Sequence, residues 1–276
     1  MNKEKCCTIS CEKPLDQDYW DAQYKANSTG WDLGCVSPPI QSYINALTNK
    51  EQAILIPGCG NTHEAEYLLQ KGFSNVTVID IAPTLVEILK QRFKVNPNIR
   101  IVLGDFFEHQ GKYDLILEQT FFCALPPWMR QKYIWKMHQL LNTNGILAGV
   151  LFNKEFESGP PFGGNQKEYE HLFKNAFELT SIETACNSVL PRANCELAFK
   201  FKKNNEVVVT LYSIEGITCK GCKEIVIQKF SEINSILNVS MNNTFTSILI
   251  VSKTEIQLTE LQSIIANDGN YKITKL

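Results

Sequence analysis

The chain has 276 residues, a net charge of −2 and 44% hydrophobic residues. This length suits one large domain or two unequal ones, and the apolar content suffices for a packed core. The near-neutral charge argues against a nucleic-acid partner, because such proteins usually carry a basic face. No apolar run approaches the roughly 18 residues that span a bilayer, and the first residues lack the apolar segment of a secretory signal. We therefore expect a cytoplasmic protein with no membrane partner, whose ten cysteines are mostly reduced.

Strand-like and helix-like segments alternate between residues 53 and 152. Apolar runs predict strands at 53–56, 76–79, 99–103, 113–117 and 145–152. Helical periodicity is seen at 64–71, 84–93 and 130–141, and it places Leu85, Ile88, Leu89 and Phe93 on one side of the second helix. This alternation is typical of a parallel sheet covered on both faces, whose ligands bind at the carboxyl ends of the strands. The residues that follow each strand are therefore the candidates for a site.

Three successive strand ends carry residues suited to a cofactor that contains adenosine. Gly58 lies in the turn after the first strand, where glycine lets the backbone approach a ligand closely. Asp80 ends the second strand, where a carboxylate can accept both hydroxyls of a ribose. Asp105 and Phe106 follow the third strand, where an acid can meet the edge of adenine while a ring packs on its face. Helix capping is the simpler role for each Asp, but the three strand ends together favour a cofactor site.

Further motifs extend this pattern along the chain. They are Leu55–Gly60, Gly104–Phe107, Tyr113–Ile116, Thr120–Ala124, Met129-Arg130, Ser158–Phe162 and Glu196–Ala198, with Trp20, Tyr24, Trp31–Gly34 and Pro38-Pro39 at the amino end. Together they resemble the thiopurine and thiol/halide methyltransferase family, within the Rossmann-like enzymes that use S-adenosylmethionine (SAM). The resemblance covers about residues 16–202. It implies an α/β methyltransferase domain, taken as residues 16–203, with a seven-stranded sheet whose last strand is antiparallel.

The resemblance also implies which residues contact SAM. They are the lid aromatics Trp20, Tyr24 and Trp31, the strand-end residues Gly58, Asp80, Asp105 and Phe106, and Gln119. Tyr24 stands where some members have Trp, and Gln119 stands where a tyrosine is often found. Aromatic rings suit this cofactor because they attract the cationic sulfonium of SAM.

Three phenylalanines are candidates for an apolar acceptor pocket, namely Phe121, Phe122 and Phe162. Ordinary core packing is an equally good interpretation of each. The sequence offers no clear general base, although His63 and His109 lie in loops. A soft nucleophile needs little acid–base help, and positioning alone can contribute roughly 7–11 kcal/mol. We therefore expect S-methylation of a small molecule such as a thiol, hydrosulfide, thiopurine, halide or metalloid species, with the catalytic residues left unassigned.

A second, smaller domain is predicted at residues 204–276, after a polar linker at about 203–206. All eleven prolines, four tryptophans and four histidines precede residue 204. Strand-like runs occur at 207–214, 236–241, 246–252 and 271–276, and helices are expected after 222 and at 258–265. The resulting order, βαββαβ, is that of a ferredoxin-like domain.

Cys219 and Cys222 lie where the first of these helices begins. A Cys-x-x-Cys pair can be a redox couple, half of a zinc site, or a pair of thiolates for a soft cation such as Cu(I). The domain has no proline to face a thioredoxin-type pair, and no His or third Cys to complete a zinc site. The segment 216–222 is similar to the heavy-metal-associated (HMA) domain of copper chaperones and metal-pumping ATPases, with Ile217 in place of the usual Met. This resemblance implies a Cu(I) site and a metal-exchange partner protein.

The sequence alone leaves two alternative functions open and does not assign a role to the first residues of the chain. The protein could be mainly a metal-binding, metallochaperone-like protein whose SAM-binding domain is non-catalytic. It could also methylate oxygen or nitrogen, which would require a base. Residues 1–15 are predicted to be a disordered tail, and the role of its Cys6, Cys7 and Cys11 is not assigned.

Overall fold

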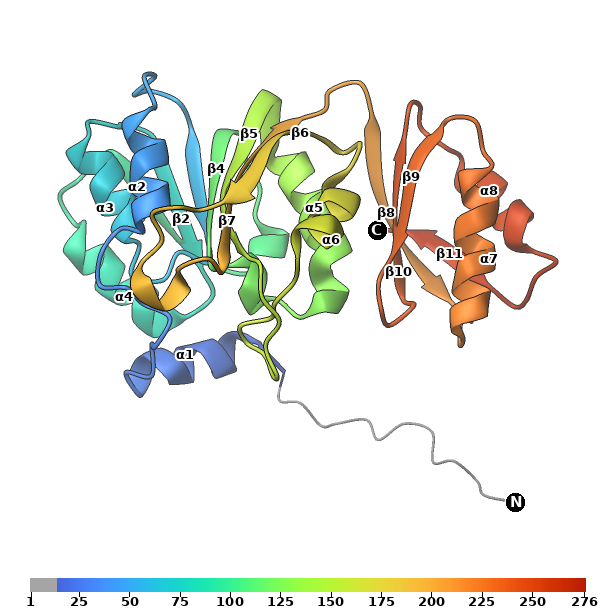
Figure 1. The fold of residues 1–276 in the computed structure, drawn as a ribbon, viewed down its shortest axis with the longest axis horizontal. Helices are drawn as coiled ribbons and strands as arrows, with labels where there is room; N and C mark the ends of the chain where they lie inside the picture. Colours follow the sequence, from blue (N-terminus) through green and yellow to red (C-terminus); the bar gives the residue numbers. More distant parts are fainter. Residues whose placement is uncertain (1–13) are drawn as a thin grey trace, which may run out of the picture.

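Two β-sheets follow one another along the chain in the computed structural model, which describes residues 14–276 (Figure 1). The predicted tail, with its three cysteines, lies almost wholly outside the described residues. No helix in the part of the chain that is described is long and apolar enough to cross a membrane.

The first sheet has seven strands in the order β3-β2-β1-β4-β5-β7-β6. Its strands are β1 (Ile54–Pro57), β2 (Val76–Asp80), β3 (Ile99–Leu103), β4 (Tyr113–Gln119), β5 (Leu141–Phe152), β6 (Phe177–Thr184) and β7 (Glu196–Lys203). Strand β7 runs antiparallel to both of its neighbours, and the other pairs are parallel. The predicted seven-stranded sheet with an antiparallel last strand is therefore confirmed.

Helices cover both faces of this sheet. They are α1 (Gln17–Lys25), α2 (Pro38–Asn45), α3 (His63–Gln70), α4 (Pro83–Arg92), α5 (Arg130–Leu140) and α6 (Gln166–Phe173), with short 3₁₀ turns η1 (Phe106–Glu108), η2 (Phe122–Ala124), η3 (Pro127–Met129) and η4 (Leu190–Arg192). Alternate strand residues point to opposite faces. Thus Ile54 and Ile56 join the core under α2 and α3, while Leu55 joins the core under α5.

The predicted apolar side of the helix at 84–93 needs one correction. Leu85 and Leu89 are buried as expected, but Ile88 is 51% exposed and Val86 is buried in its place. The face that α4 turns to the sheet therefore carries Leu85 and Leu89, with the partly buried Phe93 packed against the same core.

The second sheet is antiparallel and has the order β11-β8-β10-β9. Its elements are β8 (Val208–Glu215), α7 (Lys220–Ser231), β9 (Ile236–Met241), β10 (Ser247–Ser252), α8 (Leu258–Ile265) and β11 (Lys272–Lys275). Ile248 and Ile250 of β10 share a core with Val226 of α7 and Leu261 of α8, so these helices cover one face of the sheet.

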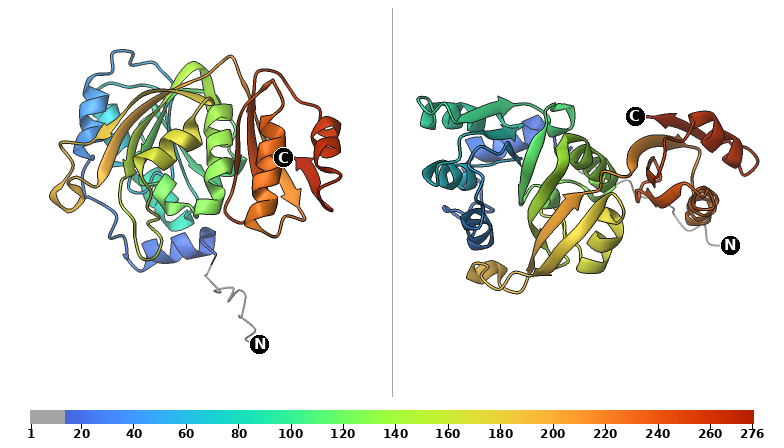
Figure 2. Two further views of the ribbon diagram at one scale, coloured as in Figure 1. Left: turned by 45° about the vertical axis from the view of Figure 1, so that its right-hand side comes forward. Right: turned by 90° about the horizontal axis from the view of Figure 1, so that it is seen from above.

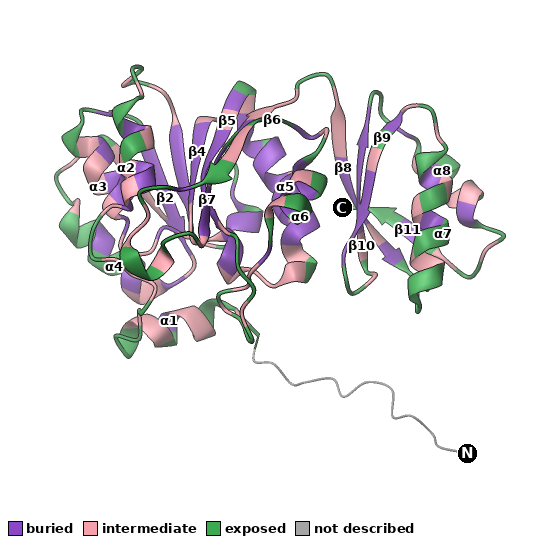
Figure 3. Ribbon diagram, in the orientation of Figure 1, coloured by how far each residue is buried: buried purple, intermediate pink, exposed green. Residues whose placement is uncertain are grey.

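The opposite face of the small sheet packs against α5. Leu249 and Val251 of β10, with Leu211 of β8, belong to the same buried cluster as Tyr133 and Ile134 of α5. Figure 2 shows the small sheet directly beside α5, and in Figure 3 most of α5 and of β10 is coloured as buried. Helix α5 is therefore sandwiched between the two sheets, and both parts of the chain share one core.

Candidate active site

A large cavity of about 890 Å³ opens at the carboxyl edge of the large sheet. Its volume falls in the range of ligand pockets, about 300–1,000 Å³. The cavity is walled by α1 and the residues that follow it, by the turns after β1 to β4, by the loop after β5, and by η4. This edge is where ligands of such sheets bind.

The amino-terminal segment from Pro14 to Cys35 forms a lid over this cavity. The Trp31 ring meets the rings of Trp20 and Tyr24 edge to face, with centroids 5.6 and 5.9 Å apart. All three line the cavity. Edge-to-face packing of this kind fixes the rings relative to one another.

The lid is tied to the body of the domain on two sides. Asp32 Oδ1 lies 2.8 Å from His63 Nε2, and the other Asp32 oxygen accepts from the Asn61 side chain. On the far side, Arg192 Nη2 donates to the Trp31 carbonyl at 2.7 Å. Both contacts join residues that are remote in sequence, so the lid position is set by the folded domain.

The turn after β1 brings Gly58 and Asp80 together at the cavity wall. Gly58 and Gly60 both have φ of +52°, a region that favours glycine. The Asp80 carboxylate accepts from Gly60 N at 3.1 Å and from Ala82 N at 3.0 Å. Its burial raises the pKa of Asp80 above the ordinary value. A Cβ at Gly58 would overlap the Phe121 ring, so glycine is needed there for protein packing.

Asp105, Phe106 and Gln119 line the same cavity. Asp105 Oδ1 accepts from Phe107 N at 2.8 Å and caps η1, so the capping role considered from the sequence is present. Two buried polar atoms of the cavity wall, Gln119 Oε1 and Thr62 Oγ1, have no hydrogen-bond partner. Buried polar atoms normally have partners. Unpaired polar atoms beside aromatic rings therefore fit a ligand such as SAM, which carries both donors and apolar surface.

The three predicted acceptor-pocket phenylalanines take different positions. Phe121 lines the cavity. Phe122 is 1% exposed and packs against Tyr133, 4.9 Å away between ring centroids, so its assignment to the pocket was wrong. Phe121, just before η2, lines the cavity, while Phe122, the first residue of η2, belongs to the buried core. Phe162 does not line the cavity either, and its loop instead contributes Pro160 and Pro161.

Glu118 lies behind this wall and was missed by the sequence analysis. Its side chain is fully buried. Oε1 accepts from Phe121 N at 2.8 Å and Phe122 N at 2.9 Å, while Oε2 accepts from Tyr133 Oη at 2.6 Å. Burial raises the pKa of Glu118 to about 7, although these hydrogen bonds act in the opposite direction. The sequence signal that could have found it is a carboxylate directly after the apolar run Leu115–Leu117.

Arg192 is a second cavity residue that the sequence analysis did not single out. Besides holding the lid, it pairs with the buried Glu196 at 3.3 Å. Of the two histidines considered as bases, His63 lines the cavity but is engaged by Asp32. His109 is hydrogen-bonded to Tyr113 at 2.7 Å and does not line the cavity.

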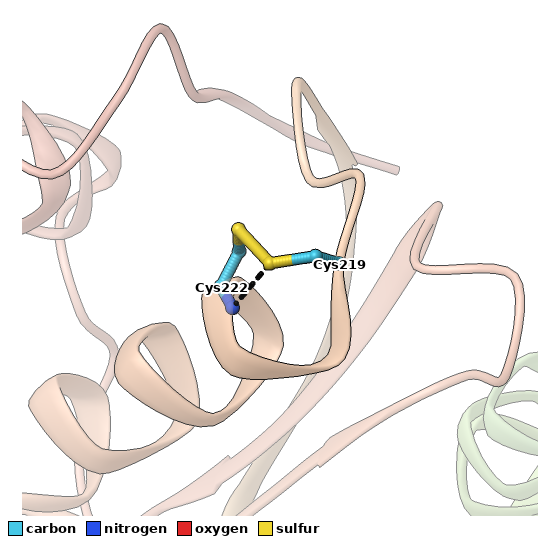
Figure 4. Close-up of a disulfide and its surroundings, with 2 residues drawn as sticks. All are labelled: Cys219 and Cys222. Atoms are coloured by element: carbon cyan, nitrogen blue, oxygen red, sulfur yellow. Dashed lines mark hydrogen bonds between the residues drawn. A yellow bond between two sulfur atoms is a disulfide. The ribbon is translucent and has the colours of Figure 1, made fainter. Parts of the chain in front are cut away.

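The Cys219–Cys222 pair lies apart from this cavity, at the start of α7 (Figure 4). The two sulfurs form a disulfide, with the Cα atoms 5.2 Å apart, where reduced thiols were expected. Cys219 Sγ also accepts from Cys222 N at 3.1 Å and caps the helix. No group of three or more His, Cys, Asp or Glu residues within 14–276 is placed to hold a metal.

Comparison with known proteins decides the family. The family model described as thiopurine S-methyltransferase matches residues 15–213. The chain belongs to the thiopurine S-methyltransferase family. It is therefore a SAM-dependent methyltransferase, as the motifs predicted. The match runs past residue 203 into β8 and leaves residues 214–276 outside it.

Relatives support the same assignment for the methyltransferase. A probable thiol methyltransferase 2 from Arabidopsis thaliana is 32% identical over 199 residues, which cover 70% of this chain and 88% of that protein. A thiopurine S-methyltransferase from Vibrio vulnificus is 30% identical over 176 residues, with 57% and 81% covered. Among solved structures, the Burkholderia thailandensis 1,6-didemethyltoxoflavin-N1-methyltransferase with bound S-adenosylhomocysteine has a TM-score of 0.56 at 19% identity, covering 68% of this chain and 87% of that one. The last likeness shows a shared class I methyltransferase fold.

Proposed function

We propose that the methyltransferase transfers the methyl group of SAM to a small, soft nucleophile: a thiol, hydrosulfide, thiopurine, halide or metalloid species. The observation that carries this proposal is the combination of aromatic rings and cations in the cavity. We call the wall formed by Phe121, Leu125, Trp128 and Met129 the acceptor wall. Lys154 and Arg192 line the same cavity, and although Arg192 also pairs with Glu196, these two cations would attract an anionic acceptor to the apolar acceptor wall.

The remaining wall has the groups that SAM requires. Asp80 and Asp105 would meet the adenosine part, with Phe106 against its ring, while Trp20, Tyr24 and Trp31 would close over the cofactor. Gln119 Oε1 would gain the partner it now lacks. When bound, SAM supplies a methyl group activated by its sulfonium charge. The work left to the protein is to hold two reactants in line and exclude water, since a soft anion needs no proton removed by the enzyme.

This proposal predicts how the rate depends on pH for different acceptors. With no enzyme base, kcat/KM for a thiol should rise with pH along the ionisation of that thiol and then level off. For iodide, which has no proton to lose, it should stay flat over the range in which the protein is folded. The measurement is a set of pH–rate profiles for two thiols of different pKa and for iodide. If kcat/KM rises with pH at the same midpoint for every acceptor, including iodide, then an enzyme base is ionising, and this result would contradict the proposal.

We further propose that residues 204–276 form a ferredoxin-like, heavy-metal-associated domain, with residues 16–203 as the methyltransferase domain. The βαββαβ order, the antiparallel sheet and the cysteine pair at the start of α7 support this. Once the disulfide is reduced, two thiolates at a helix amino terminus would suit Cu(I). The bound Cu(I) could then be exchanged with a partner protein.

The metal proposal is tested on the full chain in its reduced form. One Cu(I) per chain should bind, and the Cys219→Ser, Cys222→Ser double variant should lose that ion. The matched control is Cys186→Ser, which removes an exposed free thiol elsewhere. Equal Cu(I) binding by the double variant and the wild type would contradict the site. Comparing methyl transfer with and without Cu(I) shows whether the two domains communicate.

A further inference from the structure

We propose that Asn242, in the turn between β9 and β10, is a positioning residue for the acceptor wall of the methyltransferase. This inference rests on the proposed function, because it takes that wall to be where the acceptor lies. Residue 242 falls outside the part of the chain that matches the methyltransferase family. The small domain would thus help to shape the active site from behind.

The Asn242 side chain joins the turn to the methyltransferase domain. It is 2% exposed. Its Oδ1 accepts from Thr246 N at 2.9 Å and Ser247 N at 3.1 Å, which closes the turn. Its Nδ2 donates to the Trp128 carbonyl at 3.2 Å and also lies within 3.0 Å of the hydroxyls of Thr244 and Thr246. One buried amide therefore organises the turn and reaches the acceptor wall.

Residues 128–131 lie between the small sheet and the cavity. Trp128 and Met129 line the cavity, and Trp128 is 46% exposed at its edge. The next residue, Arg130, donates to the Gly163 carbonyl at 2.6 Å and so holds the loop after β5. Gln131 then donates to Ser240 Oγ of β9 at 2.9 Å. This short segment is anchored to β9 and to the turn that follows it on one side, and it forms the acceptor wall on the other.

The turn itself is fixed inside the small domain. Lys223 of α7 donates to the carbonyl of Met241, the residue before Asn242, at 3.2 Å. The position of the Asn242 amide therefore follows from the packing of α7 on β9. If its bond to Trp128 is lost, Gln131 is the only one of these two contacts that still ties the segment to β9 and its turn, so η3 can shift relative to the rest of the cavity. Misplacement of reacting groups by about 1 Å can cost on the order of 100-fold in rate.

The test uses the full chain with Asn242→Asp and a matched control. An aspartate still accepts from Thr246 N and Ser247 N, and both threonine hydroxyls can donate to it, so the turn is retained. It cannot donate to the Trp128 carbonyl. The control is Asn238→Asp, because Asn238 Nδ2 donates across the same interface to the Lys174 carbonyl at 3.3 Å, and neither residue lines the cavity.

We expect Asn242→Asp to lower kcat/KM for the acceptor by at least fivefold, while the Kd for SAM stays within twofold. The ratio of kcat/KM for thiopurine to that for hydrosulfide should also change, and this ratio does not depend on how much enzyme is folded. Asn238→Asp should leave kcat/KM for the acceptor and the thiopurine-to-hydrosulfide ratio within twofold of the wild type. Loss of activity by both variants to the same extent, or by neither, would overturn the proposal. If Asn242→Asp does not fold, Asn242→Ser removes the same bond with a smaller, uncharged side chain.

Amide hydrogen exchange of residues 126–132 provides a readout that needs no acceptor. Exchange there should be faster in Asn242→Asp than in Asn238→Asp and the wild type. If no sulfur or halide acceptor is methylated by the wild type, the proposed function fails, and this exchange still decides the positioning role. Equal exchange in all three proteins would overturn that role.

Discussion

At the scale of a single residue, Asp80 both stabilises the fold and lines the candidate active site. Its two oxygens hold the backbone N–H groups of Gly60 and Ala82, so it fixes the turn after β1 and the start of α4. The same carboxylate faces the cavity. Its replacement should affect ligand binding more than folding, because the surrounding sheet is packed independently of it.

We expect Asp80→Ala to weaken SAM binding by more than tenfold while the protein stays folded. The physical reason is loss of the acceptor for ribose hydroxyls together with loosening of the glycine turn. Calorimetric titration with SAM measures this. The matched control is Asp114→Ala, which also removes an acceptor of a backbone N–H, from Ala53 at 2.9 Å, but does not line the cavity. An unchanged SAM affinity in Asp80→Ala would show that the ribose site lies elsewhere.

Glu118 should make stability depend on pH. Its pKa is raised from 4.5 to about 7 in the folded protein, mainly by burial. Folding therefore favours the protonated form, and the stabilisation is complete below about pH 4.5 and is lost as pH rises through 7. The difference corresponds to about 3 kcal/mol at most.

Glu118→Gln tests this contribution, because an amide can accept from the two backbone N–H groups as the protonated acid does. Urea unfolding at pH 5 and pH 8 should show a smaller loss of stability for the variant than for the wild type. The same loss in both proteins would mean that Glu118 is already ionised in the folded state at pH 5, so that its pKa is not raised by folding.

At the scale of the element, the lid depends on contacts at its two sides. Asp32→Ala removes the bonds to His63 and Asn61, while α1 keeps its own attachment through Asp21, which accepts from Thr84 N at 2.7 Å. We expect the Kd for SAM to rise by about tenfold, because this factor corresponds to the free energy of one charge-assisted hydrogen bond. Stopped-flow dissociation of SAM measures the change, which should appear as a faster off-rate. Asp18→Ala, on the exposed side of α1, is the control, and an equal effect there would argue against the contact.

The elements and the strand-end residues could be predicted from sequence because their signals are local. Gly58, Asp80 and Asp105 follow apolar runs, and parallel strands bring their ends to one edge of the sheet. The direction of Phe122 and the pairing of Arg192 with the Trp31 carbonyl could not be predicted. The first depends on the local path of a turn, and the second joins residues 161 positions apart.

At the scale of the whole molecule, the docking of the two sheets had a sequence signal that we did not use. Strand β10 is apolar at four successive positions, from Ile248 to Val251, and all four are buried. A strand of that kind is buried on both faces. The second face could have been expected to need a partner, but only the structure identifies that partner as α5.

This shared core should make the two sheets and their helices unfold together. Leu249→Ala, in the cluster shared with α5, should lower the free energy of unfolding by about 2–5 kcal/mol, as for other buried leucines. Calorimetry should show one transition for the wild type and the variant. Leu237→Ala is the control, because Leu237 is 37% exposed and should change stability far less. Two separated transitions in the wild type would contradict a common core.

The most direct test of the account follows labelled methyl groups from SAM into matched acceptors that differ in one atom. Pairs such as a thiopurine and its oxygen analogue, or a thiol and the corresponding alcohol, compete for the same cavity. The account predicts that label enters the sulfur member of each pair and that Asp80→Ala reduces this transfer. Label in the oxygen member at a similar rate, or no transfer by a protein that binds SAM, would contradict S-methylation as its function.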